Sequence, residues 1–148
     1  MRRRSRGEHG SALVEFSWLA IVLMVPLLYI VLTVFEVQKA AFATTSSARS
    51  AARAFTLAPS EAVAVERARA AALLALQDQG LGDGRGDLDI TCRPSPSNCL
   101  APGSVVTVVA RYAVPLPLLP SALGAHRPSV RVEAEHTIPY GTYREDRS

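Results

Sequence analysis

The feature that most restricts this chain is a run of residues without any charge, which extends from Phe16 to Phe35. A helix rises 1.5 Å per residue, so about 20 residues span roughly 30 Å, the thickness of the hydrocarbon core of a bilayer. A single carboxylate, Glu15, directly precedes the run, and a short cationic segment ends at Gly10. The pattern predicts a protein held in the membrane by one N-terminal span.

The positive charge is confined to the first ten residues. The chain carries 16 basic and 13 acidic side chains; this segment holds four arginines and one glutamate, which leaves 12 of each sign elsewhere. Phosphate binding requires clustered lysine and arginine, and the remainder has no net excess of them. The composition therefore argues against a nucleic-acid partner.

The flanks of the span predict its orientation. Four arginines precede it, whereas only Lys39 follows closely, beside Glu36. Because cytoplasmic flanks are positive, we expect a cytoplasmic N-terminus and an extracytoplasmic chain from about residue 40. A cleaved secretory signal is the competing interpretation. The small residues from Ala43 to Ala48 resemble a cleavage site, but the apolar run exceeds the usual 7–15 residues of such signals.

These signals divide the chain into a cytoplasmic leader (1–10), a transmembrane helix (11–37) and an extracytoplasmic domain (38–148). The first helix should continue to about Phe55, because no glycine or proline interrupts it after Pro26. Pro26 itself predicts a mild kink. A second helix is expected from Ser60, as N-cap, to about Gln79, with Gly80 ending it. Its apolar residues fall on two opposite faces, which predicts packing against two partners.

The distal half alternates with a period of two residues and predicts three half-buried strands. The fold class is therefore α+β, with a long N-terminal helix, a second helix and a small three-stranded antiparallel sheet whose apolar face a helix must cover. Residues 115–128 should form a proline-rich loop and residues 139–148 a polar tail. The apolar stripes consist of Leu88, Ile90 and Cys92; of Val106, Val108, Ala110, Tyr112 and Val114; and of Val130, Val132, Ala134 and Ile138.

Two cysteines, Cys92 and Cys99, flank a turn-rich insert between the first two strands. In an oxidising compartment this spacing predicts a disulfide. A zinc pair would need two more ligands, and His9, His126 and His136 lack ligand spacing, so no metal site is expected.

The loop before the first strand offers a weaker signal for a cation. Asp83, Asp87 and Asp89 could reach one calcium ion, but no glutamate completes the usual loop pattern, so a plain turn is favoured.

Catalytic signals are weak. The histidines are not spaced with a serine or cysteine in a nucleophile motif, and Glu133 and Glu135 lie on the polar face of a strand, where solvation is the simpler explanation. His136 falls on the apolar face, as an edge histidine. We therefore expect neither enzymatic activity nor a cofactor.

The N-terminal residues resemble a known signal. A basic leader ending at Gly10, the small residue Ser11, Glu15 five residues after the glycine, aromatic Phe16 and a long apolar helix resemble a type IV prepilin-like segment. The version Gly-Ser-Ala-Leu-Val-Glu-Phe is similar to the TadE-like pseudopilins of tight-adherence (Flp-type) pilus systems, in which tyrosine often replaces Phe16. Residues 105–115 are similar to the sheet region of that family.

The resemblance implies a minor pilin that takes part in pilus assembly. A prepilin peptidase would cut between Gly10 and Ser11, and Glu15 would pair with the new amine of Ser11 as helices of other pilins or pseudopilins pack alongside. The alternatives are a single-pass envelope protein of the same architecture that is neither processed nor incorporated into a filament, and a membrane-tethered enzyme.

Overall fold

The computed structural model describes residues 9–82, 86–115 and 129–147, with side chains from Leu13 onward. The leader up to Glu8, Asp83 of the calcium hypothesis and the proline-rich link from 116 to 128 lie outside these ranges. Two compact units divide the chain, residues 1–35 and residues 36–148. The boundary falls two residues before the predicted end of the transmembrane segment.

Helix α1 extends from His9 to Thr56 and includes Pro26 in its interior. It begins two residues before the predicted start at Ser11 and ends one residue after Phe55. The absence of glycine and of further proline after Pro26 allows this length, and the expected long helix is confirmed. Its apolar part satisfies the length and composition of a membrane span, with a mean hydropathy of 2.6 in its most apolar window.

Helix α2 extends from Glu61 to Gln77, two residues shorter than predicted at its end. Ser60 occupies the N-cap in an extended conformation, but its side chain makes no capping hydrogen bond, so the predicted side-chain cap is wrong. Gly80, with φ of 71°, ends the helix as predicted. The Gly80 N–H donates to the Gln77 carbonyl and the Leu81 N–H to the Leu76 carbonyl, which is the Schellman arrangement.

Helix α2 packs against two partners, α1 and the sheet, as predicted, but it does not use opposite faces to do so. The helix buries one stripe, and the opposite positions are exposed, including Leu74 with 59% of its surface accessible. Alanine is small and fits either face, so its sequence spacing does not show which face is buried. The two helices approach each other closely at Ser47 of α1, whose Oγ donates a 3.1 Å hydrogen bond to the Ala72 carbonyl of α2. The buried stripe consists of Ala64, Ala68, Ala72, Ala75 and Leu76.

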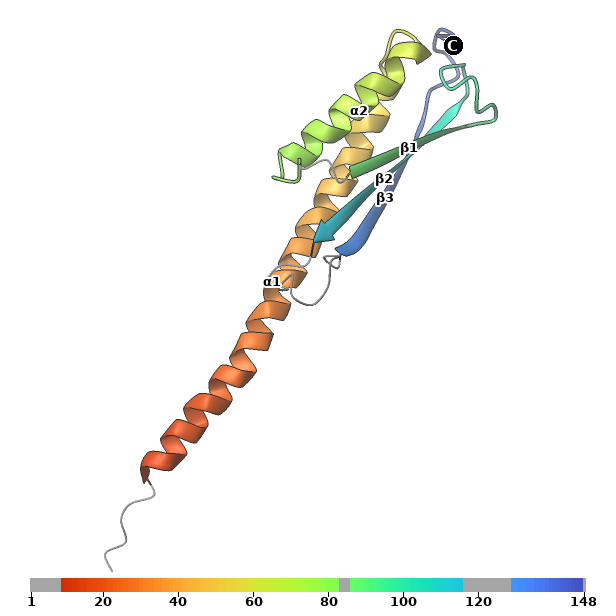
Figure 1. Ribbon diagram of the computed structural model, residues 1–148. Coiled ribbons are helices and arrows are strands. Elements are labelled where there is room, and N and C mark those ends of the chain that lie inside the picture. The colour runs from red at the N-terminus through yellow and green to blue at the C-terminus, as the bar shows by residue number, and fades with distance from the viewer. Residues whose placement is uncertain (1–8, 83–85, 116–128, 148) are drawn as a thin grey trace, which may run out of the picture. The chain divides into compact units, whose positions relative to one another are not determined.

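The sheet has three antiparallel strands in the order β1 (Gly86–Arg93), β2 (Val105–Pro115) and β3 (Ser129–Pro139). Ile90 lies opposite Val108, and Val108 opposite His136, so the predicted apolar stripes share one face. The α+β fold class is thereby confirmed. In the unit of residues 36–148, α2 lies beside the orange-to-yellow part of α1, next to the sheet (Figure 1).

The core of this unit lies between the helices and the apolar face of the sheet. Phe55 and the alanines of α1 and α2 pack against Val106 and Val108 of β2, and a second cluster joins Ala40, Ala43 and Leu76 to Tyr112 and Val114. Because small residues line both helices, their backbones can approach each other and the sheet closely.

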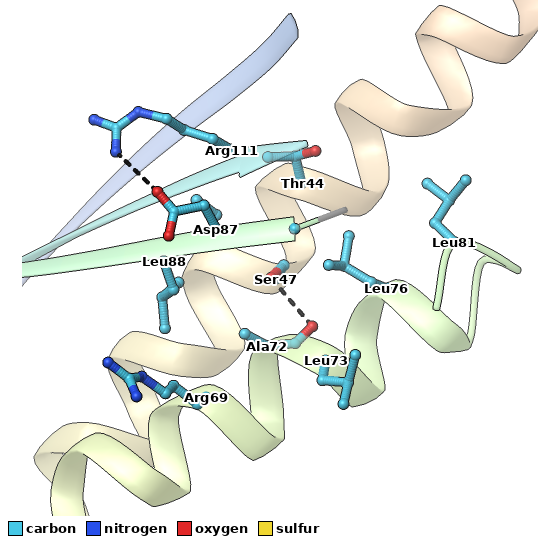
Figure 2. Close-up of a pocket in the computed structure, with 12 residues that line it drawn as sticks. Thr44, Ser47, Arg69, Ala72, Leu73, Leu76, Leu81, Asp87, Leu88 and Arg111 are labelled. Atoms are coloured by element: carbon cyan, nitrogen blue, oxygen red, sulfur yellow. Dashed lines mark hydrogen bonds and ion pairs between the residues drawn. The ribbon is translucent and has the colours of Figure 1, made fainter. Parts of the chain in front are cut away.

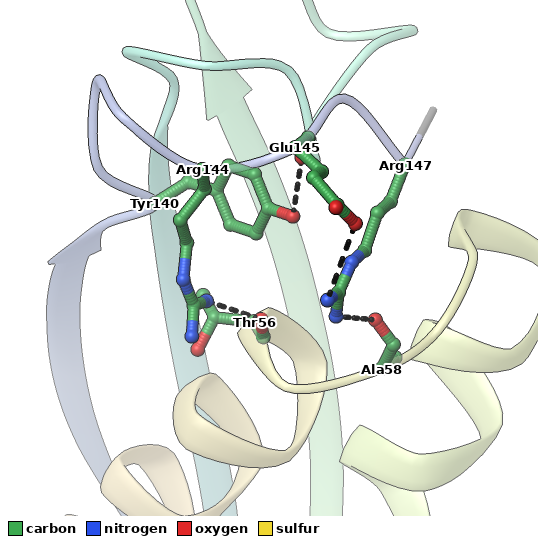
Figure 3. A network of polar contacts seen from close by, with 6 residues as sticks. All are labelled: Thr56, Ala58, Tyr140, Arg144, Glu145 and Arg147. Atoms are coloured by element: carbon green, nitrogen blue, oxygen red, sulfur yellow. Dashed lines mark hydrogen bonds and ion pairs between the residues drawn. The ribbon is translucent and has the colours of Figure 1, made fainter.

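The C-terminal segment is largely exposed, as expected of a polar tail, but it is also anchored to the rest of the unit, which the sequence did not predict. Tyr140 is 1% exposed, and its hydroxyl donates a 2.9 Å hydrogen bond to the Glu145 carbonyl. Arg144 and Arg147 reach the carbonyl oxygens of Thr56 and Ala58, at the end of α1 (Figure 3). The segment therefore anchors the end of β3 to the end of the first helix. Its arginines supply hydrogen-bond donors to backbone carbonyls that have no partner within the helix.

Candidate functional site

The predicted processing residues lie in the first turn of α1. Gly10 and Ser11 are the second and third residues of that helix, whose described side chains begin at Leu13. Glu15 follows about one turn after Ser11, and Phe16 beside it is 70% exposed. The structure places these four residues close together along one helix.

The apolar stretch that follows has its large side chains exposed within the unit of residues 1–35. Two of its hydroxyl groups, those of Ser17 and Thr33, donate 2.8 Å hydrogen bonds to the carbonyls of Leu13 and Tyr29 in the same helix. Such internal bonding lets a hydroxyl lie in hydrocarbon without a partner from outside. This stretch is therefore suited to lipid or to other apolar helices.

The two cysteines are brought together as the spacing predicts. Cys92 and Cys99 are joined as a disulfide, and both residues are buried in the core of the second unit. The Cys99 N–H donates to Glu61 Oε1 at 3.4 Å. The cysteine pair thus joins β1 to the loop that follows β1, and the same loop contacts the beginning of α2.

The outer face of the sheet carries a charged cluster on three strands. Arg111 Nε donates a 2.8 Å hydrogen bond to Glu133 Oε2, and Arg111 Nη1 lies 3.7 Å from Asp87 Oδ2. The hydrogen bond and charge of Glu133 raise the pKa of Arg111, although the side chain is solvated. Glu133 is therefore an ion-pair partner, which fits the solvated face favoured for Glu133 and Glu135.

Among the residues that the structure describes, no group of three or more histidine, cysteine, aspartate or glutamate side chains is placed to hold a metal ion. Asp87 of the calcium hypothesis instead faces Arg111. The predictions that the protein lacks a metal, a cofactor and enzymatic activity stay predictions.

A cavity of about 280 Å³ lies among α1, α2, the first residues of β1 and the residues of β2 that pair with them (Figure 2). Its walls combine leucines with the charged side chains of Arg69, Asp87 and Arg111. Sequence reasoning missed it, because its residues come from four separate elements and no spacing connects them. The lining consists of Thr44, Ser47, Arg69, Ala72, Leu73, Leu76, Leu81, Gly86, Asp87, Leu88, Ala110 and Arg111.

Comparison of the chain with protein-family models, with curated proteins and with solved structures gives no significant match.

Proposed function

We propose that this protein is a TadE-like pseudopilin, a minor pilin that takes part in assembling a tight-adherence (Flp-type) pilus. The single observation that carries the proposal is helix α1, which continues without a break from the apolar stretch into the core of the α+β unit. Such a helix can pack its apolar part against neighbouring subunits while its distal part carries a folded domain. The distal domain is large for a bulk Flp-type pilin, which favours a minor or initiating role.

The position of Glu15 supports the same function. It is the only charged residue of α1 between Ser11 and Phe35. A carboxylate drawn to the centre of a bilayer costs roughly 2.5–3.5 kcal/mol, and less near the interface. In the proposed mechanism, prepilin peptidase removes residues 1–10, and Glu15 pairs with the new Ser11 amine of its own or a neighbouring helix. An unpaired charge is unfavourable in an apolar bundle, so this pairing sets the axial register.

The proposed topology follows from the arginine-rich leader. The leader stays in the cytoplasm, and the α+β unit lies outside, where an oxidising environment maintains the Cys92–Cys99 pair. Partners are the membrane, the peptidase and other pilins or pseudopilins of the same system.

The experiment compares Glu15→Gln with Glu36→Gln in cells that make the pilus. Glutamine keeps the size of the side chain and removes its charge. Glu36 is an exposed acidic residue of the same helix, beyond the apolar run, and serves as the matched control. We expect Glu15→Gln to insert in the membrane and to be cut after Gly10, yet to be lost from sheared pili; Glu36→Gln should assemble normally.

Normal piliation and normal co-purification of Glu15→Gln with other pilins would contradict the assembly role. Together with an intact Met1, that result would favour the alternative, a single-pass envelope protein that is neither processed nor incorporated.

A further inference from the structure

The cavity beside β1 opens at the edge of the sheet. Leu88 and Ala110 lie on the covered face, whereas Asp87 and Arg111 lie on the outer face, and both pairs line the same cavity. Figure 2 shows Asp87 and Leu88 on opposite sides of the strand. A cavity that reaches both faces of a sheet must extend around the end or edge of a strand.

That strand is available for pairing. In the order β1-β2-β3, β1 is an edge strand, and no strand among the described residues pairs with its other side. An edge strand presents N–H and C=O groups that an extended polypeptide can bond. The cavity is lined by the first three residues of this strand, Gly86, Asp87 and Leu88. A chain added to β1 would therefore place alternate side chains beside the cavity.

The lining of the cavity suits an apolar side chain carried by an added strand. Its volume of about 280 Å³ is large enough to admit one such side chain. Leu73, Leu76, Leu81 and Leu88 form its apolar walls. One large apolar side chain, held by a backbone that pairs with β1, fits within this volume and complements the leucines of the lining.

The charged residues of the lining indicate which type of residue should lie next to the inserted apolar side chain. Arg111 is compensated by Asp87 and Glu133. Arg69, also in the lining, makes no hydrogen bond or ion pair with any described residue. The lining therefore has one cation whose charge is not offset by described residues, and a carboxylate is its complement.

We propose that this groove binds an extended segment of another protein, which adds a strand to β1, inserts one apolar side chain into the cavity and presents a carboxylate to Arg69. The inference is independent of leader processing and of the role of Glu15, so it holds or fails separately from the proposed pilus function.

The test is photocrosslinking in cells with the full-length protein. A benzoylphenylalanine replaces Leu73, a half-exposed residue of the cavity rim, and Leu57, exposed on the same unit but not in the lining, is the background position. The Leu73 position should give a linked product with a different protein, identified by mass spectrometry. The linked peptide should contain an apolar residue and, within two or three positions, an aspartate or glutamate.

Charge reversal makes the test specific. Arg69→Glu should lower the yield of the product by about tenfold, as expected for the loss of one charge-assisted contact and its replacement by repulsion. Arg67→Glu changes the same charge on the same helix outside the lining and should leave the yield unchanged. Replacing the acidic residue of the linked peptide by lysine should restore crosslinking to Arg69→Glu.

Several outcomes would overturn the proposal. These are a Leu73 yield no higher than that of Leu57, equal yields from Arg69→Glu and the parent protein, and a linked peptide without a carboxylate. A product linking two copies of this chain, or linking lipid alone, would also reject the proposed occupant. Unchanged membrane levels of the variants show that a lost product reflects binding and not folding.

Discussion

Arg144 Nη1 donates a 2.7 Å hydrogen bond to the carbonyl oxygen of Thr56, which is the last residue of α1 and lies 88 residues earlier in the chain. The same guanidinium lies 5.1 Å from the centre of the Tyr140 ring. The terminal carbonyls of a helix have no partner within it, and a cation near them also interacts favourably with the negative end of the helix dipole. One side chain thus joins the end of β3 to the end of the first helix.

We expect Arg144→Met to destabilise the α+β unit by about 1–2 kcal/mol, since it removes a charged donor from a helix carbonyl and a cation from an aromatic face. Pulse proteolysis of the full-length protein in detergent, at increasing urea, measures the loss. Tyr143→Ala is the matched control, because Tyr143 is fully exposed in the same segment and should be neutral. Equal stability of Arg144→Met and the parent protein would show that this contact contributes nothing measurable.

The alanine stripe of α2 predicts a strong difference between neighbouring positions. Ala68 is fully buried, whereas Ala70 is exposed. Ala68→Leu adds three carbons between closely packed elements and should cost about 1–3 kcal/mol or more, whereas Ala70→Leu should change stability by less than about 0.5 kcal/mol. Urea unfolding followed by circular dichroism distinguishes them. Equal effects at the two positions would mean that α2 packs differently.

The cysteine pair should be oxidised in protein taken from the native envelope. Intact mass with and without reductant should differ by the mass of two hydrogens, after acid quench. Because the loop closed is short, with a sequence separation of 7, replacing both cysteines by serine should cost roughly 2–3 kcal/mol at most. Two free thiols in the quenched sample would reject the predicted pairing.

Leader removal is tested separately from assembly. N-terminal sequencing of the membrane-extracted protein should begin at Ser11. Gly10→Val should block the cut, because a side chain there crowds the backbone as it enters an active site, whereas Gly7→Val should be processed. An intact Met1 in cells with an active prepilin peptidase would exclude processing of this chain.

Local patterns alone determined several features of this protein. The charge-free run before Glu36 predicted a long apolar helix, because helix length and hydropathy are properties of neighbouring residues. Alternation in residues 88–138 predicted three strands and the face that each buries, since a strand exposes its two faces at every second residue. The spacing of Cys92 and Cys99 predicted their proximity, because only a short turn-rich insert separates them.

The tertiary structure decided what depends on partners distant in sequence. The buried face of α2 was not predictable, because alanine barely distinguishes one helix face from another and the approach of α1 and the sheet selects it. The anchored C-terminal segment was missed, since its acceptors are backbone carbonyls at Thr56 and Ala58, which no side-chain pattern reveals. The cavity at β1 likewise exists only because four elements meet around Arg69 and the leucines.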